Sequence, residues 1–182
     1  NNNKFPFKSK KSIIENSVSN LRLESEAILK LISNMNEDFV KVVEAILQGK
    51  GRVIVTGIGK SAIIAQKIVA TFNSTGTPSI FMHAADAVHG DLGMIQTDDI
   101  VICLSKSGNT PEIKILAPLL KQSNNLLVAI LGQMDSDLAK QADLVLNTTV
   151  EKEAGPHNLA PTTSTTAKLA MGTALAICWL EG

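Results

Sequence analysis

Five short apolar runs alternate with helix-like segments along most of this chain, and this alternation restricts the possible folds more than any other feature. The runs lie at residues 53–55, 79–82, 100–104, 126–131 and 144–146. Connections long enough to hold a helix are typical of parallel strands, whereas the strands of a hairpin need only a short turn. Helices then cover both faces of the sheet. The sequence therefore predicts an α/β fold built on a five-stranded parallel sheet.

An aliphatic composition agrees with a sheet that is buried on both faces. Hydrophobic residues make up 45% of the 182 residues, but aromatic residues only 3%. A core of Ile, Leu, Val and Ala suits a parallel sheet better than a β-sandwich. Upstream of the sheet, apolar residues at spacings of three and four predict amphipathic helices over residues 9–34 and 36–49. We expect a disordered tail at 1–8, N-terminal helices that pack on the domain at 9–50, and one α/β domain at 51–182.

The charge balance argues against two classes of partner. The chain has 17 basic and 17 acidic residues, so its formal net charge is zero. Neither nucleic acid nor an anionic membrane surface is therefore a predicted partner. Cys103 and Cys178 lie in apolar runs without metal-binding spacing, and the chain opens without an apolar signal segment. We expect reduced cysteines, a cytoplasmic location and no metal ion.

A polar hexapeptide follows the third apolar run and precedes a predicted helix at 111–122. At such a junction of a parallel α/β protein, free backbone N–H groups and the positive end of a helix dipole converge and bind anions. One helix cap needs only one hydroxyl or amide side chain. The hexapeptide offers four, Ser105, Ser107, Asn109 and Thr110. We therefore predict that these four residues bind a phosphate group.

Two further junctions offer similar chemistry with less specificity. Gly59, Lys60 and Ser61 follow the first apolar run, where the Gly-x-Gly pattern matches neither a dinucleotide fingerprint nor a P-loop. The glycines could serve tight helix packing alone, but an ammonium and a hydroxyl at a helix N-terminus favour a ligand role. Thr162 and Ser164 belong to a hydroxyl cluster before the last predicted helix. They fit an N-cap and a ligand contact equally well.

Carboxylates and a histidine near these loops are candidates for proton transfer. Glu112 stands in the first turn of the helix after the phosphate loop, where its alternative role is to interact with the helix dipole. Glu153 precedes a tight turn, and its alternative role is a solvated surface charge. His89 and His83 bracket a loop with Asp91, but their spacing matches no standard metal site. A structural histidine is the alternative there.

These motifs, in this order, resemble the sugar-isomerase (SIS) domain, and more closely the arabinose-5-phosphate isomerases. The matching segments are VTGIGKS at 55–61, STGTP at 74–78, HGDLGM at 89–94, SKSG at 105–108, EAGP at 153–156 and LAPTTSTT at 159–166. The Ser-x-Ser-Gly loop is common to SIS domains in general. The segments at 89–94 and 159–166 are those that point to the arabinose-phosphate branch.

The resemblance implies a three-layer αβα sandwich and an activity. The activity would be interconversion of D-ribulose 5-phosphate and D-arabinose 5-phosphate, without an organic cofactor, toward the lipopolysaccharide or capsule sugar Kdo. Members of the family are usually homotetramers with sites at subunit contacts, so a homo-oligomer is expected. The resemblance gives a catalytic set, Lys60, Glu112, Glu153 and His89. The expected substrate- and phosphate-binding set is Gly59, Ser61, Ser105, Ser107, Asn109, Thr110, Thr162 and Ser164.

Three departures from the family pattern bear on the expected function. Lys106 replaces an Asn, and Asn109 and Thr110 replace Glu-Ser, which adds a cation beside the expected phosphate. The CBS pair of many members is absent from the sequence. The His-Pro-Gly-Gly block that members carry after the last helix is absent too, so either His89 or His157 replaces its histidine, or the sequence is trimmed, or activity is impaired.

We expect Glu153 to act as the base that forms an enediolate, which requires a pKa near the working pH. Lys60 would stabilise the enediolate oxygens, and Glu112 would move protons between hydroxyls. Two alternatives stay open. One is a regulatory module that binds a sugar phosphate without turnover, and the other is an isomerase of a different phosphosugar.

Overall fold

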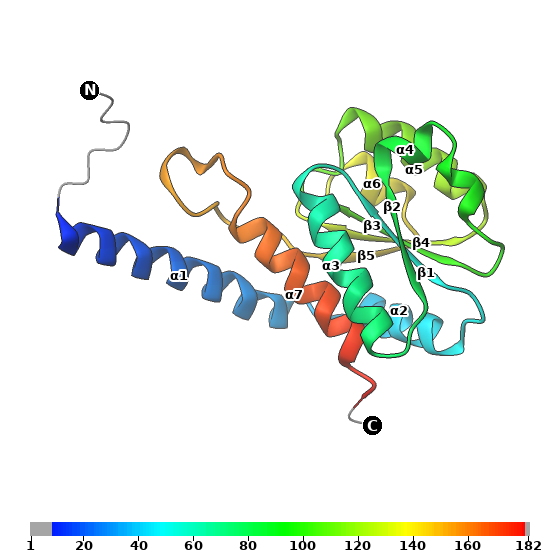
Figure 1. Ribbon diagram of the computed structural model, residues 1–182, viewed down its shortest axis with the longest axis horizontal. Helices are drawn as coiled ribbons and strands as arrows, with labels where there is room; N and C mark the ends of the chain where they lie inside the picture. Colours follow the sequence, from blue (N-terminus) through cyan, green and yellow to red (C-terminus); the bar gives the residue numbers. More distant parts are fainter. Residues whose placement is uncertain (1–8, 181–182) are drawn as a thin grey trace.

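Five parallel strands form one sheet in the part of the chain that the structure describes (Figure 1). The computed structural model describes residues 9–180, so the tail expected at 1–8 lies outside the described residues. The strands are β1 (Val53–Gly57), β2 (Ser79–His83), β3 (Ile100–Ser105), β4 (Leu126–Leu131) and β5 (Leu144–Asn147). Their order across the sheet is β2-β1-β3-β4-β5. The predicted five-stranded parallel sheet is confirmed.

The strand order reverses direction between β1 and β3. From β1 the chain crosses to β2 on one side, and β3, β4 and β5 then follow in order on the other side. The last residue of β1, Gly57, pairs with Leu104 of β3, so both strands end at the same level. Loops that leave two such strands diverge to opposite faces and open a crevice at the carboxyl edge of the sheet. This topology selects the loops after β1 and β3 as walls of a binding site.

Helices cover both faces of the sheet, which confirms the three-layer αβα sandwich. One layer holds α1 (Lys10–Ser33), α2 (Glu37–Gln48), α3 (Lys60–Ser74) and α7 (Thr163–Ile177). The other holds α4 (Ala84–Val88), α5 (Pro111–Gln122) and α6 (Asp137–Gln141), with the short 3₁₀ helix η1 (Asp91–Met94). A second 3₁₀ helix, η2 (Pro156–Asn158), lies in the loop before α7. No helix within residues 9–180 is both long and apolar enough to span a membrane.

Helices α3 and α7 approach each other closely beside the sheet (Figure 1). A Cβ atom added at Gly172 of α7 would stand only 2.2 Å from Cδ1 of Ile68 on α3. The absence of a side chain at Gly172 therefore permits the contact. One turn earlier on α7, the same approach brings Lys168 against Ser61 at the start of α3. The packing of two helices thus sets part of the site.

Local signals explain most element boundaries, and two boundaries differ from the prediction. Asn36 and Ser136 accept hydrogen bonds from the third helical N–H of α2 and α6, as N-caps do. The sequence predicts a last helix from about 165 to 180, whereas the helix observed runs from Thr163 to Ile177. Its earlier start follows from Glu153, whose carboxylate accepts a hydrogen bond from the Ser164 N–H. Over residues 83–94 the sequence predicts a loop with a helical turn, and the structure has two short helices there, α4 and η1, which are too short to show an apolar period.

Candidate functional site

A cavity of about 230 Å³ opens at the carboxyl edge of the sheet, between the loops after β1 and β3. It therefore lies at the point where the strand order reverses, as expected for a ligand site in an open α/β sheet. Its lining residues are Ile58, Lys60, Ser61, Leu104, Ser105, Lys106, Ser107, Thr110, Pro161 and Lys168. Five of the predicted site residues line this one cavity: Lys60, Ser61, Ser105, Ser107 and Thr110.

The loop after β3 is held in a tight turn by its own hydroxyls. Ser105 Oγ accepts a hydrogen bond from the Gly108 N–H at 2.9 Å, and Ser107 Oγ accepts one from the Asn109 N–H at 3.2 Å. Gly108 has a φ of +66°, and an added Cβ there would stand 2.3 Å from Ser136 Oγ. Both facts require glycine. The turn is therefore built before any ligand arrives, with its hydroxyls beside the cavity.

Asn109 and Thr110, the last two residues of the predicted phosphate loop, face different surroundings. Asn109 does not line the cavity; its Oδ1 accepts a hydrogen bond from the Asp137 N–H at 2.9 Å, which ties the loop to the start of α6. Thr110 is the N-cap residue of α5, but its hydroxyl makes no capping bond. That hydroxyl is buried and has no hydrogen-bond partner among residues 9–180. Thr110 therefore has a free donor and acceptor at the cavity wall.

The loop after β1 brings a lysine and a serine to the opposite wall. Gly59 has a φ of +58°, which lets the chain turn sharply into α3. Lys60 is exposed at the rim of the cavity. Ser61 is buried, and its Oγ accepts a hydrogen bond from Lys168 Nζ at 2.8 Å. The N-terminus of α3 and two polar side chains thus meet at the cavity.

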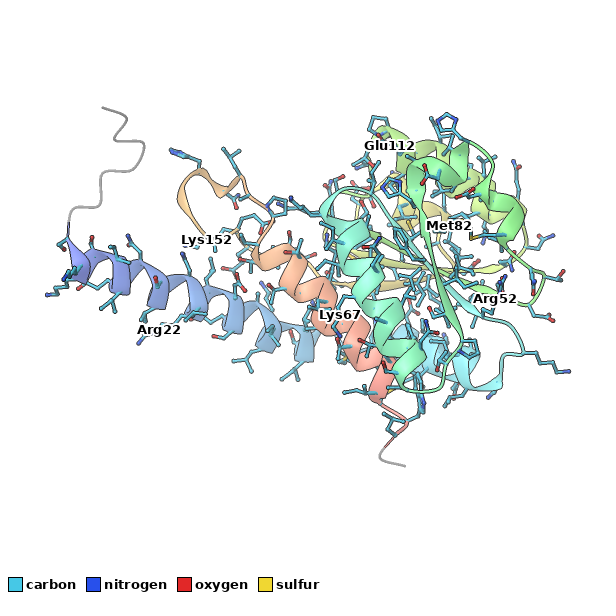
Figure 2. The ribbon with its side chains drawn as sticks, viewed as in Figure 1. Arg22, Arg52, Lys67, Met82, Glu112 and Lys152 are labelled. Atoms are coloured by element: carbon cyan, nitrogen blue, oxygen red, sulfur yellow. The ribbon has the colours of Figure 1, made fainter. Side chains whose placement is uncertain are left out.

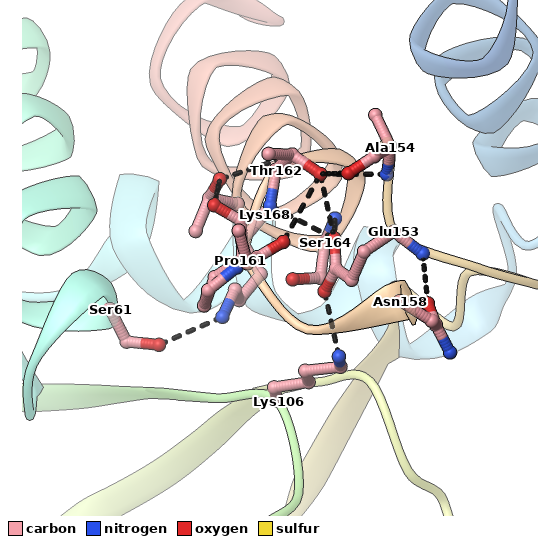
Figure 3. Close-up of polar contacts among 11 residues, drawn as sticks. Ser61, Lys106, Glu153, Ala154, Asn158, Pro161, Thr162, Ser164 and Lys168 are labelled. Atoms are coloured by element: carbon pink, nitrogen blue, oxygen red, sulfur yellow. Dashed lines mark hydrogen bonds and ion pairs between the residues drawn. The ribbon is translucent and has the colours of Figure 1, made fainter. Parts of the chain in front are cut away.

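Glu153 lies beside this cavity rather than in its wall, in the loop before α7 (Figure 3). Its side chain is fully buried, and its Oε2 accepts hydrogen bonds from the N–H groups of Thr162 and Ser164 at 2.9 and 3.0 Å. Lys106 Nζ stands 2.7 Å from its Oε1. The carboxylate therefore caps α7 and pairs with the phosphate-loop lysine.

These contacts give Glu153 a low affinity for a proton. Burial alone raises its pKa, but hydrogen bonds from Lys106, Ser164 and Thr162 outweigh the burial and lower the pKa to about 2. This low pKa of Glu153 differs from the pKa near the working pH that we expected for a catalytic base. The reason is the helix cap and the ion pair, neither of which is visible in the local sequence around Glu153.

The structure also places Lys168 at the cavity, although the sequence analysis did not select it. Lys168 is only 2% exposed. Burial lowers its pKa to about 8, while the charge of Glu153 raises it and that of Lys106 lowers it. One sequence feature could have identified it: Lys168 is the one charged residue of α7, in a segment otherwise made of apolar, small and hydroxyl residues. Together with Lys60 and Lys106, it surrounds the cavity with three ammonium groups and no carboxylate in the wall.

The other predicted catalytic residues lie away from the cavity wall. Glu112 is half-buried in the first turn of α5, in the layer of α4 and α6 (Figure 2). His89 is exposed and ends α4. Their roles therefore stay predictions. Over residues 9–180, no group of three or more His, Cys, Asp or Glu side chains is arranged to hold a metal ion.

The fold and the site define a class of protein: an αβα sandwich with a cationic, hydroxyl-lined cavity at the switch point of its sheet. Such a cavity suits a small anion. The family follows from the sequence comparison. The chain belongs to the SIS domain family, whose model matches residues 46–178.

Similar proteins of known name include isomerases. The chain is 52% identical over 159 residues to the arabinose 5-phosphate isomerase KdsD of Pseudomonas aeruginosa, covering 87% of this chain and 49% of that protein. It is 47% identical over 173 residues to the KdsD of Francisella tularensis, covering 93% and 53%. The chain thus spans about half the length of these relatives. Among solved structures, the protein c3406 of Escherichia coli CFT073 in complex with arabinose 5-phosphate is similar, with a TM-score of 0.89, 39% identity, and coverage of 95% and 92%.

Proposed function

We propose that this protein is an aldose–ketose isomerase that interconverts D-arabinose 5-phosphate and D-ribulose 5-phosphate. The observation that carries the proposal is the cavity at the switch point, where hydroxyls and lysines gather without a carboxylate in the wall. The identity with arabinose 5-phosphate isomerases and the similarity to a structure that holds arabinose 5-phosphate support the choice of substrate. The arabinose 5-phosphate would enter Kdo synthesis, the pathway that the family resemblance implies.

The phosphate end of the substrate would bind in the turn after β3. Ser105, Ser107 and Thr110 offer hydroxyls there, and Ser61 offers one from the opposite wall. The N-termini of α3 and α5 add their positive dipole ends. Binding energy from this non-reacting end would hold the sugar carbons in place for proton transfer.

The reacting end would lie toward Lys60 and the Glu153 loop. A base removes the proton from C2 of the aldose, and the electron pair forms a C1–C2 enediolate with its charge on O1. The O2 proton then moves to O1, which leaves the charge on O2. The base returns its proton to C1 as the C2–O2 bond becomes the ketone carbonyl. Lys60, at the cavity rim, would stabilise the charged oxygens. Gly59, Thr162, Ser164 and Asn109 would act by positioning these elements.

Glu153 is the base in this proposal, on the condition that the substrate draws Lys106 away. The ion pair with Lys106, together with the hydrogen bonds from Ser164 and Thr162, holds the pKa of Glu153 at about 2. A phosphate dianion in the turn after β3 would compete for the same ammonium. Release from Lys106 would leave Glu153 buried with fewer donors, which raises its pKa toward the working pH. Glu112 and His89 complete the proposed catalytic set.

One assay tests the function. Purified protein is mixed with arabinose 5-phosphate, and formation of ribulose 5-phosphate is followed, with deuterium incorporation at C2 in D₂O. Glu153→Gln keeps an oxygen for the two helix N–H groups, so the fold and binding should persist. We expect kcat to fall about 10²- to 10⁴-fold and the C2 exchange to fall with it. Exchange at the wild-type rate would remove Glu153 from the role, and binding without turnover by the wild type would favour the regulatory module.

We also propose that the protein assembles as a homo-oligomer, with a tetramer as the expected state. Helix α1 projects beyond the sheet (Figure 1) and presents large apolar side chains to solvent. A cleft of about 770 Å³ separates it from the Glu153 loop. A second copy of the chain would cover both features.

A further inference from the structure

Lys168 is a buried ammonium group without an ion-pair partner. It is 2% exposed, and no Asp or Glu side chain of the described residues lies within ion-pair distance of its Nζ. Its one hydrogen bond goes to Ser61 Oγ at 2.8 Å (Figure 3). An ammonium has three N–H donors, and a buried charge is costly unless it is paired. Two donors of Lys168 therefore have no acceptor in the part of the chain that the structure describes.

The free donors belong to a side chain that lines the cavity at the switch point. Lys60 and Lys106 line the same cavity, and so does the unpartnered hydroxyl of Thr110. Lys106 is paired with Glu153, but Lys60 and Lys168 line the cavity without an ion-pair partner among the described residues, and no carboxylate lines it. A small dianion would supply both the missing acceptors and the missing charge.

The charges around Lys168 make its protonation sensitive to a bound anion. Burial lowers its pKa to about 8, the charge of Lys106 lowers it too, and the charge of Glu153 raises it. Ser61 and Lys60 face it from α3, and Lys106 faces it from the loop after β3. A dianion bound among these groups favours the charged ammonium, so binding would take up a proton in the mildly alkaline range.

We propose that Lys168 is a phosphate-binding residue of this site, donating to an oxygen of the phosphate held by the serines of the β3–α5 turn. This inference rests on the phosphosugar function proposed above and adds a ligand group from α7 to it. Ser61 then has two functions: it binds the phosphate and it orients the ammonium of Lys168. A neutral sugar would gain no binding energy from the ammonium of Lys168, so this residue would favour phosphorylated sugars over neutral ones.

The test compares Lys168→Met with Lys41→Met, a control on the exposed face of α2. Binding is measured calorimetrically at about pH 7.5 for arabinose 5-phosphate and for inorganic sulfate, a dianion at every pH used. We expect Kd for both ligands to rise at least tenfold in the Lys168 variant and to stay unchanged in the control. Equal Kd values for the Lys168 variant and the wild type would overturn the proposal.

A measurement on the unaltered protein does not depend on how a variant folds. The Lys168 side chain is titrated by NMR with and without saturating sulfate, between about pH 7 and pH 10. We expect its pKa to rise by more than one unit with sulfate. An unchanged pKa would contradict direct contact. Sulfate and sugar-phosphate binding that depends on Lys168, in a protein that does not convert arabinose 5-phosphate, would leave this inference standing and remove the isomerase function.

Discussion

Lys106 connects two parts of the site that the sequence separates by 47 positions. It extends from the turn that would hold the phosphate, and its Nζ stands 2.7 Å from Oε1 of Glu153. Glu153 in turn accepts hydrogen bonds from the N–H groups of Thr162 and Ser164 at the start of α7. One ammonium therefore has two possible anionic partners, a carboxylate in the free protein and a phosphate in the complex. Occupancy of the phosphate site would in this way set the proton affinity of the expected base.

Lys106→Met should raise the pKa of Glu153 from about 2 toward its ordinary value. Because the folded-state pKa lies below the unfolded one, Glu153 contributes stability above about pH 4.5 and loses it as pH falls toward 2. Lys106 is half-exposed, so the variant should lose only about 1 kcal/mol near pH 7. The loss should shrink as pH falls below about 4.5 and disappear near pH 2, where the wild-type carboxyl is itself protonated. Urea unfolding at both pH values and NMR titration of the Glu153 carboxyl measure these effects.

Lys152→Met is the matched control for the Lys106 variant, because Lys152 is exposed next to Glu153 and makes no ion pair within the described chain. It should leave the pKa of Glu153 unchanged. If Lys106→Met also leaves that pKa unchanged, the ion pair does not control the carboxylate, and the proposed exchange of partners is wrong.

Local pattern was sufficient to find some site residues and not others. Ser105, Ser107 and Thr110 stand together in the sequence after a strand, so their meeting at one cavity follows from the strand alone. Lys168 meets Ser61 across 107 positions, through the close approach of α3 and α7. The capping role of Glu153 likewise depends on a loop that returns to a distant helix. Such tertiary contacts leave no periodic signal.

At the scale of elements, the two edges of the sheet have different tasks. The carboxyl edge carries the cavity, and the amino edge carries an ion pair that ties β1 to β3. Arg52 Nη2 stands 2.6 Å from Oδ2 of the buried Asp99. Asp99 also accepts hydrogen bonds from the N–H groups of Arg52 and Gln96, both at 2.8 Å. Burial raises the pKa of Asp99, but these bonds lower it below its ordinary value overall.

Asp99→Ala should therefore destabilise the protein by about 3 kcal/mol, because it leaves two N–H groups and a guanidinium without their acceptor. Affinity for arabinose 5-phosphate should not change, since the ligand would bind at the opposite edge. Denaturant unfolding and calorimetry measure the two quantities. Asp98→Ala, at the exposed neighbouring residue, should change neither. A loss of affinity equal to the loss of stability would contradict this division between the edges.

Elements with a clear period or a clear cap were predictable, including the five-residue α6 behind its Ser136 cap, whereas residues 83–94 were predictable only as a loop with a helical turn. The strands and the helices α3 and α5 show apolar patterns long enough to identify, with caps or glycines at their ends. Helices α4 and η1 have five and four residues. Helix α4 packs against α5 and β2, and η1 packs against α4, and the sequence between residues 83 and 94 does not encode these contacts by itself.

At the scale of the whole molecule, α1 is the helix whose apolar side chains a single chain leaves mostly exposed. Only Leu31 of its 24 residues is buried. Large apolar side chains follow one another at spacings of three, four and seven and are each 40% to 70% exposed: Ile14, Val18, Leu21, Ile28 and Ile32. This spacing is typical of helices that pack along their length against other helices. An exposed apolar stripe of this kind on a projecting helix indicates a protein–protein contact. A second copy of the chain would bury it.

Leu21→Glu combined with Ile28→Glu should dissociate the proposed oligomer, because each change places a charge in the apolar stripe. The domain itself should stay folded, since neither side chain belongs to its core. Sedimentation velocity at several concentrations measures the assembly, and circular dichroism measures the fold. Ile115→Glu, at an exposed position of α5 outside the stripe, is the control and should leave the assembly unchanged. A wild-type chain that sediments as a monomer at every concentration would refute the oligomer, and a stripe variant that assembles as the wild type does would place the subunit contact on another face.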